Sequence, residues 1–266
     1  MSPPGLDAPR AGVADDSYLR PGDGLVVTGA AQGIGRAVAL RLAASGARLA
    51  LWDVKADGLA ETAELCRKSG GEVLTAVVDM GESGDVAAAA QAVGAAWGAP
   101  FGFVSNAGIF PRSPILETDP AVWERVLKVN LVGAFLLARH LGPLMTARKR
   151  GAAVMIASGR ALQGTPRGAH YAASKAGLVS FTKSLALELA PQGIRVNCVI
   201  PGVTETAQPL EDSTLEEVRA RGSRIPLGRI GQPDDIAAGV AMLLGKDAVY
   251  MTGQCIALNG GAQMIP

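Results

Sequence analysis

Two side chains that could move a proton, Tyr171 and Lys175, stand four residues apart in the segment HYAASKAGLVSF. Residues at this spacing share one face of a helix, so the ammonium and the phenol would be neighbours. A phenol with a pKa of about 10 is a poor base near neutral pH, but a nearby positive charge favours the phenolate and lowers that pKa. Ser158, thirteen residues before Tyr171, could hold a substrate oxygen by hydrogen bonding. These residue types predict acid–base chemistry, provided that the fold brings them together.

Short apolar runs alternate with helical stretches from residue 24 onward. Because strands that alternate with helices form a parallel sheet covered on both faces, the pattern predicts an α/β fold with a doubly wound sheet of about seven strands. We expect strands at 24–29, 47–53, 72–79, 101–108, 151–158, 193–202 and 254–261. We expect helices at 34–45, 83–97, 119–147 and 169–190, and another that begins near Pro233.

The alternation continues without a linker or a repeat, which predicts one domain over residues 22–266. Residues 1–21 are rich in proline and acidic residues and lack the apolar core of a secretory signal, so we expect a mobile N-terminal tail. The polar, proline-punctuated segment 203–232 is the one long irregular insertion. Such a segment within a compact domain is typical of a functional element, and we expect 203–228 to form a substrate lid.

Composition excludes several classes of function. The formal net charge is +1, which gives no electrostatic reason to expect a nucleic-acid partner or an anionic membrane. No apolar run reaches the length of about 18 residues that spans a membrane. The two histidines, His140 and His170, lie far apart and have no acidic cluster beside them, so no metal site is expected. Three widely spaced cysteines fit a reducing compartment, and we expect a cytoplasmic protein.

A glycine-rich turn follows the first expected strand in the segment TGAAQGIG. Gly29, Gly33 and Gly35 permit a tight turn and let a pyrophosphate approach the backbone amides at the start of a helix. Their spacing, G-x3-G-x-G, differs from the common dinucleotide motif G-x-G-x-x-G. Asp53 ends the second expected strand, where a carboxylate accepts hydrogen bonds from the adenosine ribose and repels a 2′-phosphate. The cofactor expected from these residues is NAD rather than NADP.

With these pieces in order, residues 22–264 resemble the short-chain dehydrogenase/reductase family of the compact single-domain type, which has a Rossmann-type fold. The resemblance rests on several motifs in their order along the chain. They are TGAAQGIG (28–35), Asp79 in VVDM, NAG (106–108), Asn130 in KVNLVGAF, Ser158, YAASK (171–175), PGVTET (201–206) and GQCIALNGG.

The resemblance implies a catalytic role for four residues. Ser158 would hold the substrate oxygen, and Tyr171 would act as general acid/base. Lys175 would lower the pKa of the tyrosine and bind the nicotinamide ribose. Asn130 would anchor a water that links Lys175 to solvent. The alternative for Asn130 is a purely structural role, in which its mid-helix amide only forms hydrogen bonds with the neighbouring backbone.

The resemblance also implies cofactor contacts after several strands. The glycine turn would hold the diphosphate, Asp79 would meet the adenine ring, the NAG segment would border the adenosine side and stiffen the sheet, and the PGVTET segment would flank the nicotinamide. Thr204 departs from the family pattern, in which a branched aliphatic residue is commoner. The expected cofactor-binding residues are Gly29, Gln32, Gly33, Ile34, Gly35, Asp53, Val54, Asp79, Met80, Asn106, Ala107, Gly108, Tyr171, Lys175, Pro201, Gly202, Thr204 and Thr206.

The expected reaction is hydride transfer between a nicotinamide and a secondary alcohol or ketone, with Tyr171 as the acid–base group. Arg160, Gln163, Arg167 and His170 fall on segments that the fold would place near the pocket mouth, together with Arg112. Arginines there could favour an anionic substrate, although arginines on loops are often merely solvated. His170 would point away from Tyr171 by about 100° of helix rotation, so we expect it at the rim.

Two alternatives remain open at this point. One is a 3-oxoacyl-type ketoreductase of the same family, against which Asp53 counts because NADP preference is usual there. The other is a dinucleotide-binding sensor without catalysis, which predicts damage to the Ser/Tyr/Lys set, whereas all three residues are present. The expected partners are a small alcohol or ketone and further copies of the chain, in a homotetramer or a dimer.

Overall fold

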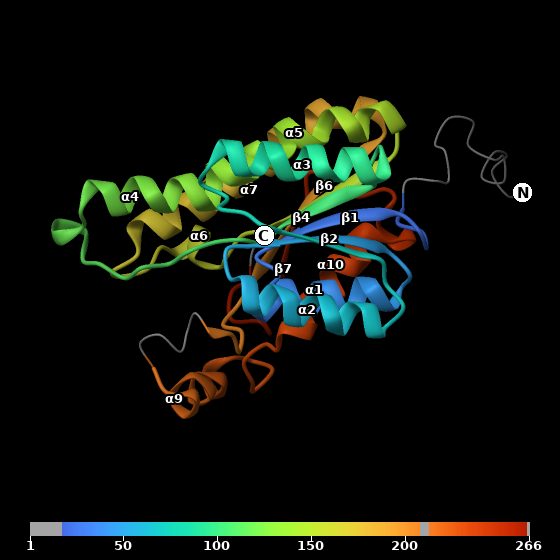
Figure 1. Cartoon of the computed structure of the whole chain (residues 1–266). Helices are drawn as coiled ribbons and strands as arrows, with labels where there is room; N and C mark the ends of the chain where they lie inside the picture. Colours follow the sequence, from blue (N-terminus) through green and yellow to red (C-terminus); the bar gives the residue numbers. More distant parts are fainter. Residues whose placement is uncertain (1–17, 208–212, 265–266) are drawn as a thin grey trace, which may run out of the picture.

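The computed structural model describes residues 18–207 and 213–264. Its centre is a sheet of seven parallel strands in the order β3-β2-β1-β4-β5-β6-β7 (Figure 1). The predicted α/β fold with a doubly wound sheet is therefore confirmed. The strands are β1 (Gly24–Thr28), β2 (Arg48–Asp53), β3 (Val73–Val77), β4 (Gly102–Ser105), β5 (Gly151–Ile156), β6 (Ile194–Pro201) and β7 (Cys255–Leu258).

The strands at the centre of the sheet are buried on both faces, which explains their continuous apolar sequences. Every residue of β1, β4, β5 and β6 is buried. Gly102 in β4 lies so close to β5 that a Cβ would approach the carbonyl oxygen of Ala152 to 1.7 Å. The strand order reverses between β1 and β4, and in open α/β sheets ligands bind at the carboxyl ends of the strands beside such a switch point.

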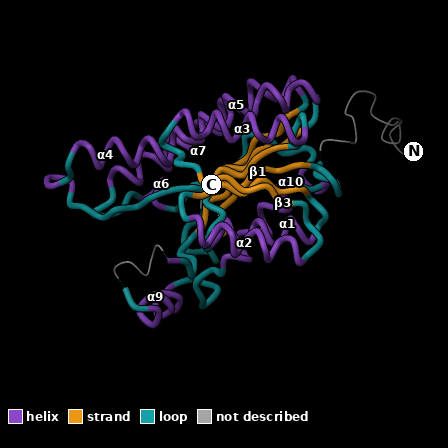
Figure 2. Tube along the Cα trace, in the orientation of Figure 1, coloured by secondary structure: helices purple, strands orange, loops and turns teal. Residues whose placement is uncertain are grey.

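Helices cover the sheet in two layers, and each layer closes one apolar core. The first layer consists of α1 (Gly33–Ala44), α2 (Ala56–Lys68) and α10 (Pro233–Leu244). The second consists of α3 (Ser83–Trp97), α5 (Gly133–Arg148) and α7 (Ala169–Leu189). Figures 1 and 2 show the sheet between them. The buried residues of α7, among them Tyr171, Lys175 and Leu178, follow helical spacing, so the stripe that packs on the sheet also carries the proposed acid–base pair.

The long helix expected at 119–147 runs from Pro120 to Arg148 and contains a π-type turn. The structure has α4 (Pro120–Leu127), a π-type turn η2 (Lys128–Val132) and then α5. Asp119 caps α4 by accepting a hydrogen bond from the backbone N of Ala121 at 2.8 Å. The π-type turn inserts one extra residue per turn and carries the buried Asn130. Such turns are frequent at functional sites.

Short helices complete the described chain. They are η1 (Ile115–Glu117), α6 (Arg160–Gln163), η3 (Ala190–Gln192), α9 (Leu215–Ala220), η4 (Arg221–Arg224) and η5 (Lys246–Ala248). In Figure 1, α4 and α6 extend from one end of the sheet and α9 lies apart from both helical layers.

Two expectations fall partly outside the described residues. Residues 1–17 of the expected tail and residues 208–212 of the expected lid belong to the undescribed part of the chain. Of the remaining tail, the backbone N of Leu19 donates to the carbonyl oxygen of Leu244 at 2.9 Å, which joins the start of the described chain to the end of α10. Of the lid, Thr214 and Glu217 form a capping box that starts α9.

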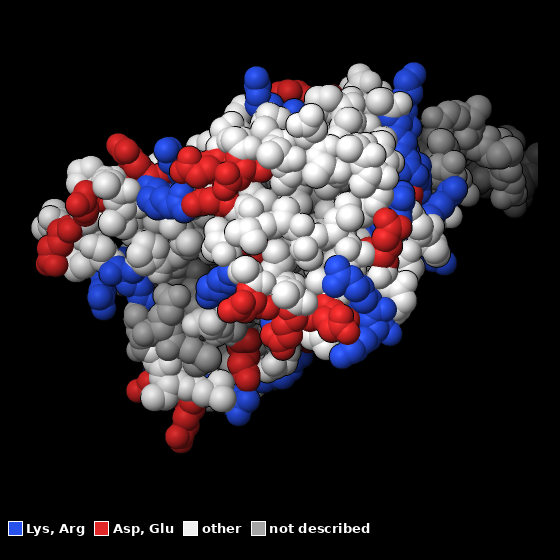
Figure 3. Space-filling view, viewed as in Figure 1, with Lys and Arg blue, Asp and Glu red and all other residues white. Residues whose placement is uncertain are grey.

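Charged side chains of both signs are interspersed on the face shown in Figure 3, and a broad area over α3 carries none. That helix is rich in alanine. The longest helix, α7, is too polar to cross a bilayer, and within residues 18–207 and 213–264 no other helix qualifies either.

Candidate active site

A cavity of about 790 Å³ lies at the carboxyl ends of the strands and gathers most of the predicted site residues. The predicted residues that line it come from the segments after β1 to β6, from the start of α1, from α6 and from α7. They are Gly29, Gln32, Gly33, Ile34, Asp53, Val54, Asp79, Met80, Asn106, Ala107, Gly108, Ser158, Arg160, Gln163, Tyr171, Lys175, Pro201, Gly202, Thr204 and Thr206.

Two glycines of the glycine turn, Gly29 and Gly33, line the cavity without a side chain. Gly29 and Gly33 have φ of +65° and +56°, in the left-handed region that favours glycine. A Cβ on Gly35 would lie 2.0 Å from the carbonyl oxygen of Gly29, so the start of α1 can approach the end of β1 only without a side chain. The turn therefore leaves room at the N-terminus of α1, where a diphosphate binds in dinucleotide sites. Gly35 itself lies beneath the turn and does not line the cavity.

Asn106 fixes this turn from the neighbouring strand. Its Nδ2 donates to the carbonyl oxygens of Thr28 and Gly29, at 3.0 and 3.1 Å. The hydroxyl of Thr28 in turn accepts from the backbone N of Asn106 and of Ala107, at 3.0 and 3.1 Å. These bonds tie the end of β4 to the end of β1. The expectation that the NAG segment stiffens the sheet has this geometric support.

The carboxylate of Asp53 is oriented by two backbone amides. Oδ2 accepts from the N of Ala31 and Oδ1 accepts from the N of Lys55, both at 2.9 Å. A carboxylate held in this way at the end of β2 is positioned for hydroxyl donors of a ribose. The side chain of Lys55 also lines the cavity and lies 3.4 Å from Oε1 of Gln32. Lys55 therefore places a cation close to the acid.

Asp79, at the predicted adenine end, is engaged by the protein itself. Its Oδ2 pairs with Arg125 on α4, and its Oδ1 accepts from the N of Gly81 at 2.8 Å. Burial raises the pKa of Asp79, but the hydrogen bond and the charge of Arg125 outweigh it, so the net pKa lies below the ordinary value. Asp79 is thus ionised and fixed at the cavity wall beside Arg125, which also lines the cavity.

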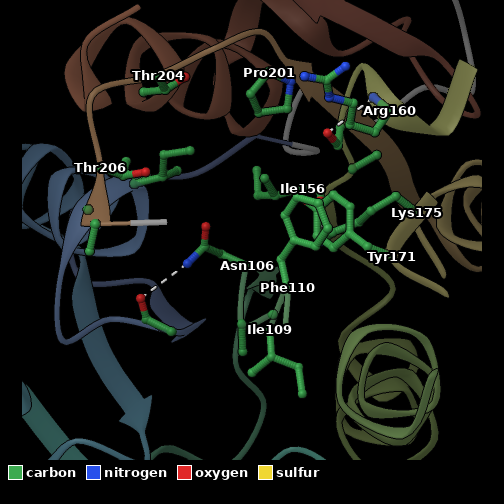
Figure 4. A pocket seen from close by; sticks show the side chains of 18 of the residues that line it. Asn106, Ile109, Phe110, Ile156, Arg160, Tyr171, Lys175, Pro201, Thr204 and Thr206 are labelled. Atoms are coloured by element: carbon green, nitrogen blue, oxygen red, sulfur yellow. Dashed lines mark hydrogen bonds between the residues drawn. The ribbon is translucent and has the colours of Figure 1, made fainter. Parts of the chain in front are cut away.

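Tyr171 and Lys175 lie on one face of α7, as the spacing predicts, and Figure 4 shows both beside Ile156. Nζ of Lys175 lies 5.8 Å from the centroid of the Tyr171 ring and donates to the carbonyl oxygen of Ile156 at 2.7 Å. The lysine is only 3 % exposed, and burial lowers its pKa to about 8. Ser158 follows β5, and its Oγ accepts from the N of Arg160 at 3.2 Å. This leaves the Ser158 O–H as the donor for a substrate oxygen.

Asn130 forms part of a backbone clamp and does not line the cavity. Its Oδ1 accepts from the N of Ile109 at 2.8 Å, and its Nδ2 donates to the O of Ile109 and to Oγ of Ser174, both at 3.0 Å. Ser174 Oγ donates to the carbonyl oxygen of Tyr171 at 2.7 Å. The π-type turn therefore connects the segment after β4 to α7. Gly108 provides the close approach, since a Cβ there would lie 3.3 Å from Asn130 Oδ1 and 3.4 Å from Lys175 Nζ.

Two of the four expected substrate residues do not line the cavity. Arg167 is exposed on the loop before α7. His170 is 1 % exposed, with its ring 6.2 Å from that of Trp123 on α4, so its position is buried and differs from the predicted rim. Burial lowers the pKa of His170. Sequence spacing could not foresee that α4 covers this side of α7.

The segment after β6 forms the remaining wall. Pro201, Gly202, Thr204 and Thr206 all line the cavity. The hydroxyl of Thr204, which departs from the family pattern, donates to the carbonyl oxygen of Gly202 at 3.1 Å. This bond satisfies the polar group at a buried position that a branched aliphatic residue would otherwise fill.

Sequence reasoning assigned no cofactor or substrate role to several other residues of the cavity. Phe110 carries no family motif, although it directly follows NAGI, and its ring stacks on Tyr171 with centroids 4.2 Å apart. Arg221 comes from η4, and Asn259 and Gln263 follow β7. Arg112, which was expected near the pocket mouth, also lines the cavity. The other lining residues outside the predicted set are Trp52, Lys55, Val78, Ile109, Pro111, Arg125, Val129, Ile156, Ala157, Gly159, Val203, Ala207 and Ala262.

The described part of the chain contains no group of three or more His, Cys, Asp and Glu side chains arranged to hold a metal ion. The polar groups at the cavity include backbone amides and hydroxyls, which can donate hydrogen bonds, and the oriented carboxylate of Asp53, which accepts them. They fit the diphosphate and ribose of a dinucleotide. The Ser158, Tyr171 and Lys175 side chains lie farther along the same cavity.

Comparisons with known proteins agree with this geometry. The family model described as Enoyl-(Acyl carrier protein) reductase matches residues 29–263. The cis-4-hydroxycyclohexanecarboxylate dehydrogenase of Sinomonas cyclohexanicum is 37% identical over 238 residues, which cover 89% of this chain and 94% of that protein. A 3-oxoacyl-(acyl-carrier-protein) reductase of Thermotoga maritima is 34% identical over 237 residues, covering 89% and 96%. The solved structure of L-sorbose reductase from Gluconobacter frateurii, complexed with NADPH and L-sorbose, has a TM-score of 0.86 at 30% identity, covering 94% and 100%.

Proposed function

Because the chain belongs to the short-chain dehydrogenase/reductase family, and is thus an oxidoreductase that binds a nicotinamide dinucleotide, we propose a specific reaction for it. The reaction is NAD-dependent hydride transfer between the nicotinamide and a secondary alcohol or ketone. The observation that carries this proposal is the placement of Ser158, Tyr171 and Lys175 on one wall of the cavity that also contains the glycine turn.

We infer a separate role for each of the three side chains. Ser158 donates its O–H to the substrate oxygen and holds the reacting carbon beside the nicotinamide. Tyr171, as phenolate, takes the hydroxyl proton in the oxidation direction and returns it in reduction. Lys175 stabilises the phenolate by its charge, and the bond to Ile156 keeps its ammonium close to the ring. The nicotinamide, when bound, accepts or supplies the hydride.

The pKa of Lys175 makes this role sensitive to pH. Because burial lowers that pKa to about 8, the ammonium is present at neutral pH and is lost above pH 8 in the ligand-free protein. An anionic phenolate beside the lysine would raise its pKa again, since opposite charges favour each other's ionised form. The two groups therefore act as a coupled pair.

NAD rather than NADP is the proposed cofactor. The oriented carboxylate of Asp53 supports NAD, because it can accept two hydroxyl hydrogen bonds and would repel a 2′-phosphate. Lys55 favours NADP instead, since it carries a positive charge and lines the cavity together with Asp53. We give Asp53 the greater weight because two backbone bonds fix it, whereas Lys55 is an exposed, flexible side chain.

The two alternative functions, a ketoreductase and a non-catalytic sensor, predict different behaviour. The function named for the Thermotoga maritima relative is that of a 3-oxoacyl-(acyl-carrier-protein) reductase. For this alternative we expect a preference for NADPH and for 3-oxoacyl substrates. A non-catalytic dinucleotide sensor would bind NADH but turn over nothing. The intact Ser158, Tyr171 and Lys175 set in the cavity argues against the sensor.

The test combines a cofactor titration with a substrate screen. Quenching of protein fluorescence or enhancement of NADH fluorescence gives the Kd of NADH and NADPH, and absorbance at the nicotinamide band reports turnover of secondary alcohols and ketones. We expect tighter NADH binding and turnover of at least one cyclic or open-chain secondary alcohol. Binding without any turnover would favour the sensor, and a preference for NADPH with 3-oxo thioesters would favour the ketoreductase.

Assembly, location and the lid also remain proposals. Three exposed apolar residues support burial of their helices in a homotetramer or dimer: Val132 at the end of η2, Phe135 on α5 and Leu187 on α7. Light scattering coupled to gel filtration measures the oligomeric state.

Free thiols at Cys66 and Cys198 are compatible with the proposed cytoplasmic location. For the lid over 203–228, slower proteolysis within this segment in the presence of NADH is the expected result.

A further inference from the structure

The ring of Phe110 packs flat against the ring of Tyr171. Their centroids are 4.2 Å apart and their planes are inclined by 19°. Phe110 comes from the segment after β4, whereas Tyr171 lies in the first turn of α7, and Figure 4 shows the two rings overlapping in the cavity. Tyr171 is only 7 % exposed, and the stacked Phe110 ring covers one face of the side chain that is proposed to exchange a proton.

The fold leaves a dedicated space for the Phe110 ring. A Cβ on Gly168, the residue before α7, would lie 2.5 Å from Cε2 and 2.8 Å from Cζ of Phe110. The φ of Gly168 is −157°, outside the left-handed region, so the backbone conformation is not the reason for glycine here. The reason is the close approach of Phe110, together with that of Thr165, whose Cγ2 would lie 2.6 Å from the added Cβ. Gly168 and Phe110 therefore form one packing unit at the start of α7.

The backbone beside Phe110 is fixed independently of its ring. Ile109 is bonded through both its N and its O to Asn130, and Asn130 is bonded through Ser174 to the carbonyl oxygen of Tyr171. This chain of hydrogen bonds sets the distance between the Phe110 segment and α7. The stacked ring then sets the direction of the phenol, because a flat aromatic neighbour restricts rotation of the Tyr171 ring.

Resting on the proposed function, we propose that Phe110 is a positioning residue for Tyr171: it holds the phenol in its reactive orientation and keeps water from one ring face. The effect passes through Tyr171 and not through the cofactor. Loss of the stack thus affects the chemical step more than binding. A misplacement of about 1 Å at a reacting group can cost about 100-fold in rate.

Turnover gives the first test. Phe110→Leu removes the aromatic face but keeps apolar bulk, and Phe110→Tyr restores the face. We expect kcat to fall about 10- to 100-fold in Phe110→Leu, with KM and the Kd of NADH changed little, and to recover in Phe110→Tyr. The pH profile of kcat should shift in Phe110→Leu and return in Phe110→Tyr. Gly168→Ala should resemble Phe110→Leu, because the added methyl displaces the ring.

Phe181, also on α7 and half-buried in the core away from the cavity, provides the matched control. Phe181→Leu should lower Tm about as much as Phe110→Leu while kcat and its pH profile stay at the wild-type values. Equal kcat and pH profiles for Phe110→Leu and Phe110→Tyr would overturn the proposal, because they would show that catalysis does not need an aromatic ring at position 110.

Nitration of tyrosine gives a second test that needs no turnover. Tyr171 is 7 % and Tyr250 is 93 % exposed, so Tyr250 is an internal reference in the same reaction. Peptide mass spectrometry after tetranitromethane treatment should find Tyr171 protected in the wild type and nitrated several-fold faster in Phe110→Leu. Unchanged nitration of Tyr171 would refute shielding by Phe110 even if no substrate is found. Absence of turnover in the wild type, with faster nitration in the variant, would instead count against the proposed function.

Discussion

Nζ of Lys175 lies 5.8 Å from the centroid of the Tyr171 ring, and the lysine is almost entirely buried. A charged group at this position costs free energy when the ligand-free protein folds, because burial disfavours the ammonium. The acid–base pair therefore has a measurable effect on stability as well as on catalysis.

The first prediction concerns this cost. Since the pKa of Lys175 is about 8 in the folded state and 10.5 for an unperturbed lysine, the unfolded chain binds more protons between these values, and stability rises with pH across that window. Lys175→Met lacks this contribution. We expect the free energy of unfolding of the wild type, minus that of Lys175→Met, to increase by about 3 kcal/mol between pH 7.5 and 10.5. Urea denaturation followed by circular dichroism measures it, and a difference that does not vary with pH would contradict the burial of an ionisable Lys175.

The second prediction concerns the cofactor. Asp53→Asn keeps the side-chain shape but removes the negative charge that would accept ribose hydroxyls and repel a 2′-phosphate. We expect the ratio of kcat/KM for NAD to that for NADP to fall about 10- to 100-fold. Asp247→Asn, an exposed acid outside the cavity, is the control and should leave the ratio unchanged. A wild-type preference for NADP would show that Lys55, not Asp53, decides the choice.

The third prediction concerns the glycine turn. In Gly35→Ala the new methyl would lie 2.0 Å from the carbonyl oxygen of Gly29, so β1 and α1 must separate. We expect a loss of about 3 kcal/mol or more in stability and loss of NADH binding. Gly84→Ala is the matched control, because this exposed position in α3 has no atom within 4 Å of the new methyl. It should be neutral or stabilising by up to about 1 kcal/mol. Wild-type stability and NADH affinity in Gly35→Ala would refute the close approach.

The fold could be predicted from sequence because its signal is periodic and local. Buried parallel strands such as β1 and β5 appear as short, largely apolar runs, and each is followed by a helix. The Tyr171–Lys175 pair is equally local, since one turn of helix fixes it. The glycine turn and Asp53 could also be placed from sequence, because they directly follow or end the first two predicted strands.

Features that depend on packing between distant segments were not predictable in this way. The π-type turn within the expected long helix carries Asn130, whose amide bonds Ile109 and Ser174, both remote in sequence. His170 is buried because α4 packs over it through Trp123. The stack of Phe110 on Tyr171 needs the space at Gly168, and no spacing rule relates these residues.

The central claim of the proposed function is that Tyr171 transfers the proton between substrate and protein. The direct measurement is the turnover of Tyr171→Phe with NAD and a secondary alcohol found in the screen, alongside the Kd of NADH. We expect kcat to fall about 100- to 10,000-fold, the range that general acid–base catalysis contributes, with the Kd of NADH nearly unchanged. Turnover within a few-fold of the wild type would contradict the account.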